Sequence, residues 1–217
     1  MCLGVEAFGD STTNPRGGQS QALVRSPSTA VPGLPLSAVQ AIAAAYQIPQ
    51  AAQQRIFQDK KWHVARLTPY VQNINTGYNS LGVCYRFFIG RLWNPVIASA
   101  IYEAATGIPL TPEEFMLAGE RVWNLQKVLN LREGFGREHD HLPARWMNEP
   151  VQFGDSEVYL QDYDRTHRLT ATDIEKMLDA YYDERGWSLE NGSPTREKLI
   201  SLELDSIAGD LKNAGKI

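Results

Sequence analysis

Cysteine is scarce in this sequence: only two of its 217 residues are cysteine. So few thiols exclude the disulfide framework that holds small secreted domains together, and they fit a reducing cytoplasm. The chain also lacks a basic excess, because its formal net charge is −4 at pH 7. A general nucleic-acid surface needs Lys and Arg to neutralise phosphates, so we predict no nucleic-acid partner.

Long apolar runs are missing too. No run reaches the roughly 20 residues that a membrane-spanning helix needs. The first residues show no basic stretch followed by an apolar stretch, so they do not resemble a secretory signal. We therefore expect no membrane association and predict a cytoplasmic location. The sequence also lacks a convincing pair of strand patterns and any internal repeat, which leaves helices as the main expected structure.

The overall composition is that of a globular protein, with 43% hydrophobic and 21% charged residues. Residues 1–33 differ from the rest, because turn-forming Gly, Pro, Ser, Thr and Asn dominate them. We interpret residues 1–33 as a loop-rich leader, a remnant of a preceding region. Residues 34–217 are predicted to form one helical region.

Helix-start and helix-stop signals punctuate that region. Asn94 and Pro95 form a cap and a first helical residue, and Gly107 is a typical stop. Capping boxes at residues 111–114 and 172–175 open two further helices. Other predicted helices cover residues 36–46, 50–58, 60–73, 194–202 and the tail from 205. The predicted fold is mainly α, an irregular array of helices and not a long-heptad bundle.

The helix predicted to follow residue 111 has one apolar face. Its members are Phe115, Ala118, Val122, Leu125 and Leu129. Their helical spacing predicts that this face is buried and anchors the fold. The charged residues of this helix share another face, which we expect to be solvated: Glu120, Arg121 and Lys127.

Two short stretches could carry chemistry. Cys84 ends the stretch NSLGVC, residues 79–84, whose glycine would let the backbone approach a bulky group. A thiolate there could ligate a metal or a cluster, or Cys84 could be a small buried hydrophobe. His139 and His141 could form a metal site, but zinc sites usually have longer spacings and further clear ligands. We interpret the histidine stretch as a polar loop.

Further motifs lie in the second half of the chain. They are AGERVWNL at 118–125, LREGF at 131–135, DHLPAR at 140–145, MLDAYYDERGW at 177–187 and PTREKL at 194–199. In order and spacing they resemble the C-terminal region of the aldehyde ferredoxin oxidoreductase family. The resemblance runs from about residue 60 to 204, and TNPRGG at 13–18 is also similar to a family loop. It implies a fold like the C-terminal helical domains of that family, without the amino-terminal domain that cradles the pterins.

Members of that family hold tungsten, or molybdenum, between two pterin dithiolenes beside a [4Fe–4S] cluster. Their pattern Asp-x-x-Gly-Leu-Cys falls on residues 79–84. The resemblance therefore implies cofactor contacts from Asn79, Leu81, Gly82 and Val83, and a cluster ligand in Cys84. Both cofactors would be completed by residues outside this chain, and the isolated chain would be inactive. The implied reaction of the whole enzyme oxidises an aldehyde to a carboxylate with ferredoxin as electron acceptor.

Three features depart from the family pattern. The other three cluster cysteines of the family lie in an upstream group, whereas this chain has only Cys2 besides Cys84. Asn79 stands where the family usually has Asp, and Gln19 and Ser20 follow the RGG motif where many relatives place a histidine. Other substrates stay open, as in the tungsten subunit of a benzoyl-CoA reductase, and so does a helical interaction subunit without cofactor. No catalytic acid or base is assigned, and the expected partners are ferredoxin and a missing amino-terminal domain or partner subunit.

Overall fold

The computed structural model describes residues 36–82, 94–153, 155–162 and 166–217. The helices are α2 (Leu36–Ala45), α3 (Gln50–Ile56), α4 (Val64–Ser80), α5 (Pro95–Thr106), α6 (Pro112–Arg132), η3 (Arg137–His139), α7 (Ala144–Asn148), α8 (Ala171–Arg185), α9 (Arg196–Ser201) and α10 (Asp205–Asn213). Two short antiparallel pairs accompany them: β1 (Phe57–Gln58) with β2 (Lys61–Trp62), and β3 (Val151–Phe153) with β4 (Ser156–Val158). The mainly α prediction is confirmed, while the predicted leader lies outside the described residues.

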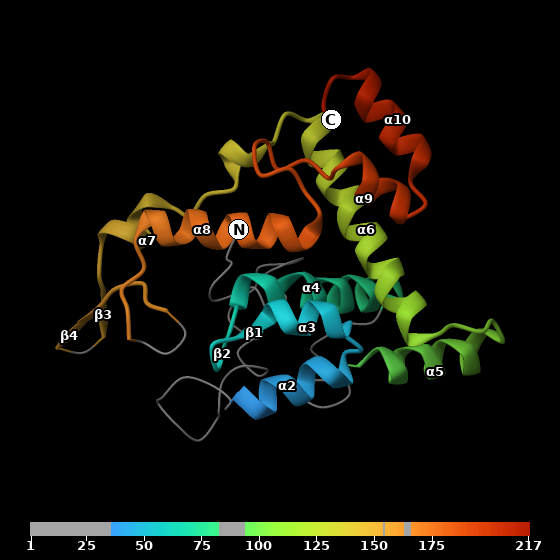
Figure 1. Cartoon of the computed structure of the whole chain (residues 1–217), viewed down its shortest axis with the longest axis horizontal. Helices are drawn as coiled ribbons and strands as arrows, with labels where there is room; N and C mark the ends of the chain where they lie inside the picture. The colour runs from blue at the N-terminus through green and yellow to red at the C-terminus, as the bar shows by residue number, and fades with distance from the viewer. Residues whose placement is uncertain (1–35, 83–93, 154, 163–165) are drawn as a thin grey trace.

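The long helix α6 joins the parts of the hydrophobic core. Phe115, near its start, packs with α2, α3 and α4 in a first cluster. Trp123, near its middle, packs against a second cluster on α8, and Val128 joins a third cluster with α9 and α10. Figure 1 shows α6 running from α5 toward α10, with α4 and α8 beside it. One helix therefore fixes the positions of the other main elements.

Helices α4 and α6 cross in close contact at Gly119. A Cβ on Gly119 would lie 2.0 Å from the backbone carbonyl oxygen of Asn73. Only glycine leaves room for the backbone of another helix at this distance. The crossing therefore sets the position of α4, whose C-terminal end leads into the predicted cofactor stretch.

The predicted apolar face of α6 is wrong in part. Phe115 is buried and Leu125 half-buried, but Ala118 and Leu129 are exposed. Lys127, expected on a solvated face, is buried and its ammonium lies 2.8 Å from the carboxylate of Asp140. The reason is tertiary: α6 meets α4 at one end and α9 and α10 at the other, so it buries different sides along its length.

Two of the three helix starts predicted from capping residues are confirmed, and the third is displaced. The Asn94 side chain accepts from the backbone N–H of Ile97, and Thr111 forms the expected capping box. The second box begins at Thr170 and pairs with Asp173, two residues before the predicted start. The buried residues of α8 include Ile174, Leu178 and Tyr181.

Two strand pairs appear where the sequence predicted none. Asp59 and Lys60, both with positive φ, form the two-residue turn between β1 and β2. The helix predicted from residue 60 therefore begins at Val64, and it continues through Pro69 to Ser80. In the described part of the chain, no helix has the length and apolar content that crossing a membrane requires.

Candidate functional site

The predicted cofactor stretch begins where α4 emerges from the core. Residues 71–78 are all buried, whereas Asn79, Ser80, Leu81 and Gly82 are exposed. The Ser80 hydroxyl donates to the backbone carbonyl of Thr76 at 2.8 Å, which closes the last turn of the helix. Three of the predicted site residues, Asn79, Leu81 and Gly82, therefore lie within one exposed stretch of four residues, which we call the exposed turn.

Gly82 gives that turn its shape. Its φ of 73° lies in the left-handed region that favours glycine. A Cβ added at Gly82 would meet nothing within 4 Å, so the described residues leave this side of the backbone open. The approach of a bulky group to this turn stays a prediction. Val83 and Cys84 lie outside the described residues.

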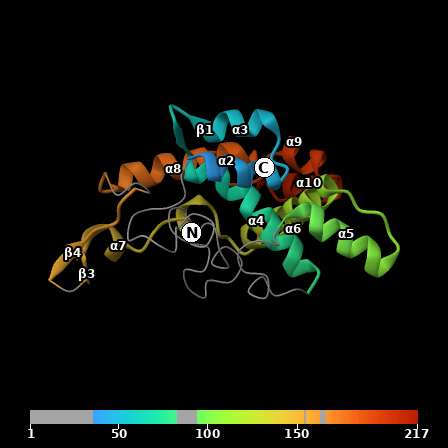
Figure 2. The same cartoon turned by 90° about the horizontal axis from the view of Figure 1, so that it is seen from below.

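The end of α4 is held firmly against its neighbours. The Tyr78 ring meets the Phe115 ring edge to face at 5.4 Å, and its hydroxyl donates to the backbone carbonyl of Asn94 at 3.3 Å. Burial raises the pKa of Tyr78, so its hydroxyl remains a donor at neutral pH. Gly77 makes room for the ring, because a Cβ there would lie 2.6 Å from Phe115 Cζ. These contacts join the C-terminal end of α4 to the N-terminal ends of α5 and α6. Figure 2 shows the three helices from below.

The middle of α4 is tied to α8 by a buried guanidinium. Arg185 is fully buried and donates to Gln72 Oε1 at 2.5 Å and to Asn73 Oδ1 at 2.7 Å. It also donates to the backbone carbonyl of Pro69 at 3.1 Å. Among the described residues no carboxylate forms an ion pair with Arg185, so neutral oxygens and the rings of Trp123 and Tyr181 surround this charge. Such bonds, made by a charged donor, are stronger than ordinary hydrogen bonds and fix the rotation of α4.

A second tie runs through Glu184, whose side chain is fully buried. Its carboxylate lies 2.6 Å from an Arg55 nitrogen and 3.1 Å from an Arg66 nitrogen, and it accepts from the Tyr70 hydroxyl at 2.7 Å. Burial by itself raises the pKa of Glu184, but the hydrogen bonds from Arg55 and Tyr70 outweigh it and hold the pKa below its usual value. Glu184 therefore stays ionised and anchors α3 and α4 on α8. The helix that leads into the exposed turn, α4, is therefore held in place by α3 and α8.

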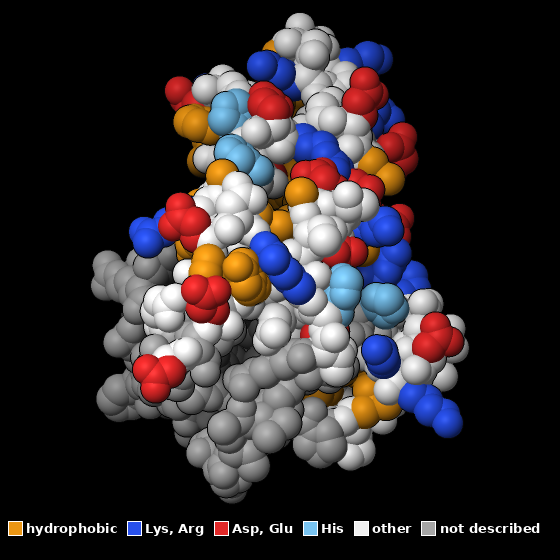
Figure 3. All heavy atoms as spheres, turned by 90° about the vertical axis from the view of Figure 1, so that its left-hand side faces the viewer, with side chains coloured by type: hydrophobic (Ala, Val, Ile, Leu, Met, Phe, Trp, Pro, Cys, Tyr) orange, Lys and Arg blue, Asp and Glu red, His pale blue; other side chains and the backbone are white. Residues whose placement is uncertain are grey.

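The histidine loop does not form a metal-ligand set. The His139 ring packs edge to face on Phe135 at 5.1 Å, and its Nδ1 lies 3.3 Å from the Glu138 carboxylate. Across the described ranges, no group of three or more His, Cys, Asp or Glu side chains is placed to hold a metal ion. Figure 3 shows acidic and basic side chains intermixed on one face of the molecule.

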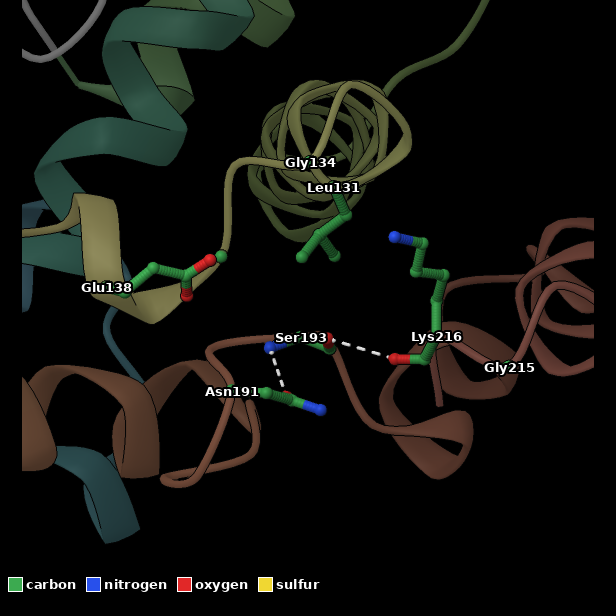
Figure 4. A pocket seen from close by; sticks show the side chains of 8 residues that line it. Leu131, Gly134, Glu138, Asn191, Ser193, Gly215 and Lys216 are labelled. Atoms are coloured by element: carbon green, nitrogen blue, oxygen red, sulfur yellow. Dashed lines mark hydrogen bonds between the residues drawn. The ribbon is translucent and has the colours of Figure 1, made fainter.

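One hollow was not anticipated from the sequence. A cavity of about 180 Å³ lies between the end of α6 and the last residues of the chain (Figure 4). Its lining residues are Leu131, Gly134, Gly136, Glu138, Asn191, Ser193, Gly215 and Lys216. They come from three separate stretches and include three glycines, so no sequence pattern marks them. Leu131 lies about 24 Å along α6 from Phe115, which separates this cavity from the exposed turn.

Comparisons with known proteins agree with this architecture. Residues 7–204 match the family model described as aldehyde ferredoxin oxidoreductase, domains 2 & 3. Over 103 residues the chain is 35% identical to the tungsten-containing aldehyde ferredoxin oxidoreductase of Pyrococcus furiosus, covering 47% of this chain and 15% of the relative. Over 100 residues it is 32% identical to the enzyme of the same name from Thermococcus kodakarensis, covering 46% and 14%.

A solved structure shows the same fold. The active site complex BamBC of benzoyl coenzyme A reductase, in complex with 1,5-dienoyl-CoA, superposes with a TM-score of 0.59 at 17% identity, covering 91% of this chain and 30% of that chain. The stretch matched in the tungsten enzymes spans only about one seventh of their length. The family match, in contrast, covers nearly all of this chain. The chain therefore belongs to the aldehyde ferredoxin oxidoreductase family, as part of its C-terminal domains.

Proposed function

We propose that this chain supplies the C-terminal helical part of a cytoplasmic tungsten- or molybdenum-pterin, [4Fe–4S] oxidoreductase. The reaction proposed for the whole enzyme is oxidation of an aldehyde to a carboxylate, with ferredoxin as electron acceptor. Family membership and the names of the relatives support the reaction class. The observation that carries the assignment of a site is the exposed turn after α4, where Gly82 leaves one side of the backbone open.

Each residue of the turn has a proposed part in binding. Gly82 lets the backbone approach the edge of a pterin, and the Asn79 amide offers both a donor and an acceptor. Leu81 and Val83 flank the contact with apolar side chains that exclude water, and the Cys84 thiolate is one of four cluster ligands. When bound, the cofactors supply the redox chemistry, and the protein supplies placement and electrostatics.

A second candidate substrate follows from the departures in the sequence. Asn79 replaces a carboxylate of the family pattern, and Gln19 and Ser20 occupy positions where many relatives have a histidine. A changed set of polar groups near the cofactor favours a substrate other than a simple aldehyde. The benzoyl coenzyme A reductase that shares the fold is an example of such an enzyme. A helical interaction subunit without cofactor is the remaining alternative, and it requires no thiol at residue 84.

The test has two arms. Anaerobic reconstitution of the isolated chain with iron and sulfide should yield no stoichiometric four-iron cluster, because its two cysteines cannot supply four thiolate ligands. A stoichiometric cluster in the purified monomer would contradict the proposal that ligands come from outside this chain.

In the complete enzyme, Cys84→Ala should abolish the [4Fe–4S] electron paramagnetic resonance signal or convert it to that of a three-iron form. Leu129→Ala, at an exposed position on α6, is the control and should leave the signal unchanged. A normal signal with normal iron content in Cys84→Ala would favour the cofactor-free interaction subunit.

A further inference from the structure

Helix α5 carries an apolar face that the described residues leave largely exposed, with only Ile97 half-buried. Its members are Val96, Ile97, Ala100, Ile101 and Ala104. Ile101 is 55% exposed and Val96 47% exposed, and Ile108, just after the helix, is 55% exposed. Glu103 is the only charged residue of α5. A helix at the surface of a globular protein normally turns charged and polar residues toward water. We call Val96, Ile97, Ala100, Ile101, Ala104 and Ile108 the α5 surface.

The buried side of α5 accounts for its contacts within this chain. Pro95, Ala98 and Ser99 are buried, and Ala98 belongs to the core cluster that contains Phe115 of α6. The Ser99 hydroxyl bonds the backbone carbonyl of Pro95 at 2.7 Å, so its polar group is satisfied inside the helix. Figures 1 and 2 both place α5 at the edge of the molecule. The opposite side of the helix is left to water or to another protein surface.

The α5 surface adjoins the exposed turn. The Tyr78 hydroxyl joins the end of α4 to Asn94, the residue that caps α5. Leu81 on the turn is itself an exposed apolar side chain. A protein surface that covers α5 therefore lies beside residues 79–82. This is the place where the missing part of a shared cofactor site has to sit.

We propose that the α5 surface is the docking site for the part of the enzyme that this chain lacks. That part consists of the remaining domains of the aldehyde ferredoxin oxidoreductase fold, in a partner chain or in a longer polypeptide. The choice of occupant rests on the proposed function and on the share of each relative's length that this chain matches. The match spans about one seventh of the tungsten relatives and 30% of the related chain in the BamBC complex, so both relatives contain much more protein than this chain supplies. Since Glu103 is the one charged residue of α5, the complementary surface must be largely apolar.

Site-specific photo-crosslinking in the source cells tests the location. A benzophenone amino acid replaces Ile101 in one variant and Leu129 in the control; both side chains are 55% exposed, on different helices. After irradiation, the residue at 101 should crosslink to a peptide with the sequence of the family's remaining domains, at least tenfold more than the residue at 129. Mass spectrometry identifies the peptide.

A substitution provides a second readout. With those domains expressed as a separate chain, Ile101→Asp should reduce their co-purification at least tenfold, whereas Leu129→Asp should not. Because Ile101 is exposed, the thermal melting of the isolated chain should be unchanged by Ile101→Asp, which separates lost docking from lost folding. Equal co-purification with both variants would overturn the inference.

The identity of the crosslinked peptide separates the other occupants. Crosslinks to a second copy of this chain, to its own residues 1–35 or 83–93, to a protein outside the family, or to nothing would each overturn the proposal. Tungsten and iron analysis of the co-purified complex separates this inference from the proposed function. A complex captured through residue 101 without either metal would refute the cofactor assignment and leave the docking site standing. A complex that contains tungsten and iron but does not crosslink through residue 101 would overturn the docking site and leave the cofactor assignment standing.

Discussion

Replacing Gly119 by alanine perturbs the crossing of α4 and α6 at one point. The new Cβ would lie 2.0 Å from the Asn73 carbonyl oxygen and 2.8 Å from its carbonyl carbon. Real Cβ atoms essentially never come within 3.0 Å of such atoms, so the two helices must separate by about 1 Å. The obstructing atoms belong to the backbone, and no side-chain rotation can relieve the contact.

Two opposing effects determine how much Gly119→Ala changes the free energy of unfolding. Alanine stabilises a helix interior relative to glycine by about 0.5–1 kcal/mol. Overpacking a well-packed contact costs typically about 1–3 kcal/mol, and more when backbone has to move. Separation of the helices would also strain the bond from Arg185 to Asn73, which lies at the same crossing. Because the obstructing atoms are backbone, the cost lies in the upper part of that range, about 2–3 kcal/mol, and the alanine gain reduces it, so we expect Gly119→Ala to lower the free energy of unfolding by about 1–2.5 kcal/mol.

Urea denaturation of the purified chain, followed by tryptophan fluorescence, measures this loss. Gly209→Ala is the matched control, because Gly209 is also inside a helix but a Cβ there meets nothing within 4 Å. It should raise stability by about 0.5–1 kcal/mol. Gly77→Ala should fall between the two, since the obstructing Phe115 ring is a side chain that can move. If Gly119→Ala proves as stable as Gly209→Ala, the close crossing of α4 and α6 is wrong.

Three further predictions concern other parts of the scaffold. Leu125→Ala should cost about 1–2 kcal/mol in urea denaturation, because Leu125 packs half-buried against the C-terminal helices, whereas exposed Leu129→Ala should stay within about 0.5 kcal/mol; equal losses would contradict the observed face of α6. Glu184→Gln should cost about 2–4 kcal/mol, because it weakens a buried ion-pair network, and Asp183→Asn, at an exposed carboxylate, less than about 1 kcal/mol. Hydrogen bonds at the start of α8 lower the pKa of Asp173 to about 2, so the stability it contributes is complete above its unfolded pKa near 4 and disappears as the pH falls through 2. Thermal melting of Asp173→Asn and the wild type should therefore differ at pH 7 and converge near pH 2, and a difference that persisted at pH 2 would contradict this assignment.

Features encoded by neighbouring residues were predictable from the sequence. The cap at Asn94, the capping box at Thr111 and the stop at Gly107 each depend on side chains or backbone angles within one helical turn. The glycine of the stretch 79–84 has a positive φ, a conformation that glycine adopts without steric cost.

Features that depend on distant residues were not predictable. Lys127 is buried because Asp140 and the rings of Tyr182 and Trp187 surround it, and no helical periodicity contains that information. The turn between β1 and β2 uses Asp59 and Lys60, without the glycine that usually marks such a hairpin. The sequence did not predict the exposed apolar side of α5, because an alanine-rich helix has the same sequence pattern whether it is buried or exposed.

The bond between Arg185 and Gln72 also sets an order of events during synthesis. The two residues are 113 positions apart, and at about 5–20 residues per second a ribosome needs roughly 6 to 23 seconds to add the second after the first. For all of that interval, the acceptors on α4 are hydrated by water and α4 has only its earlier neighbours to pack on. The local cluster of α2, α3 and α4 can form first, and α8 must then displace water from a helix that is already folded. Docking of α8 on α4 therefore removes water from two charges, the Arg185 guanidinium and the Glu184 carboxylate.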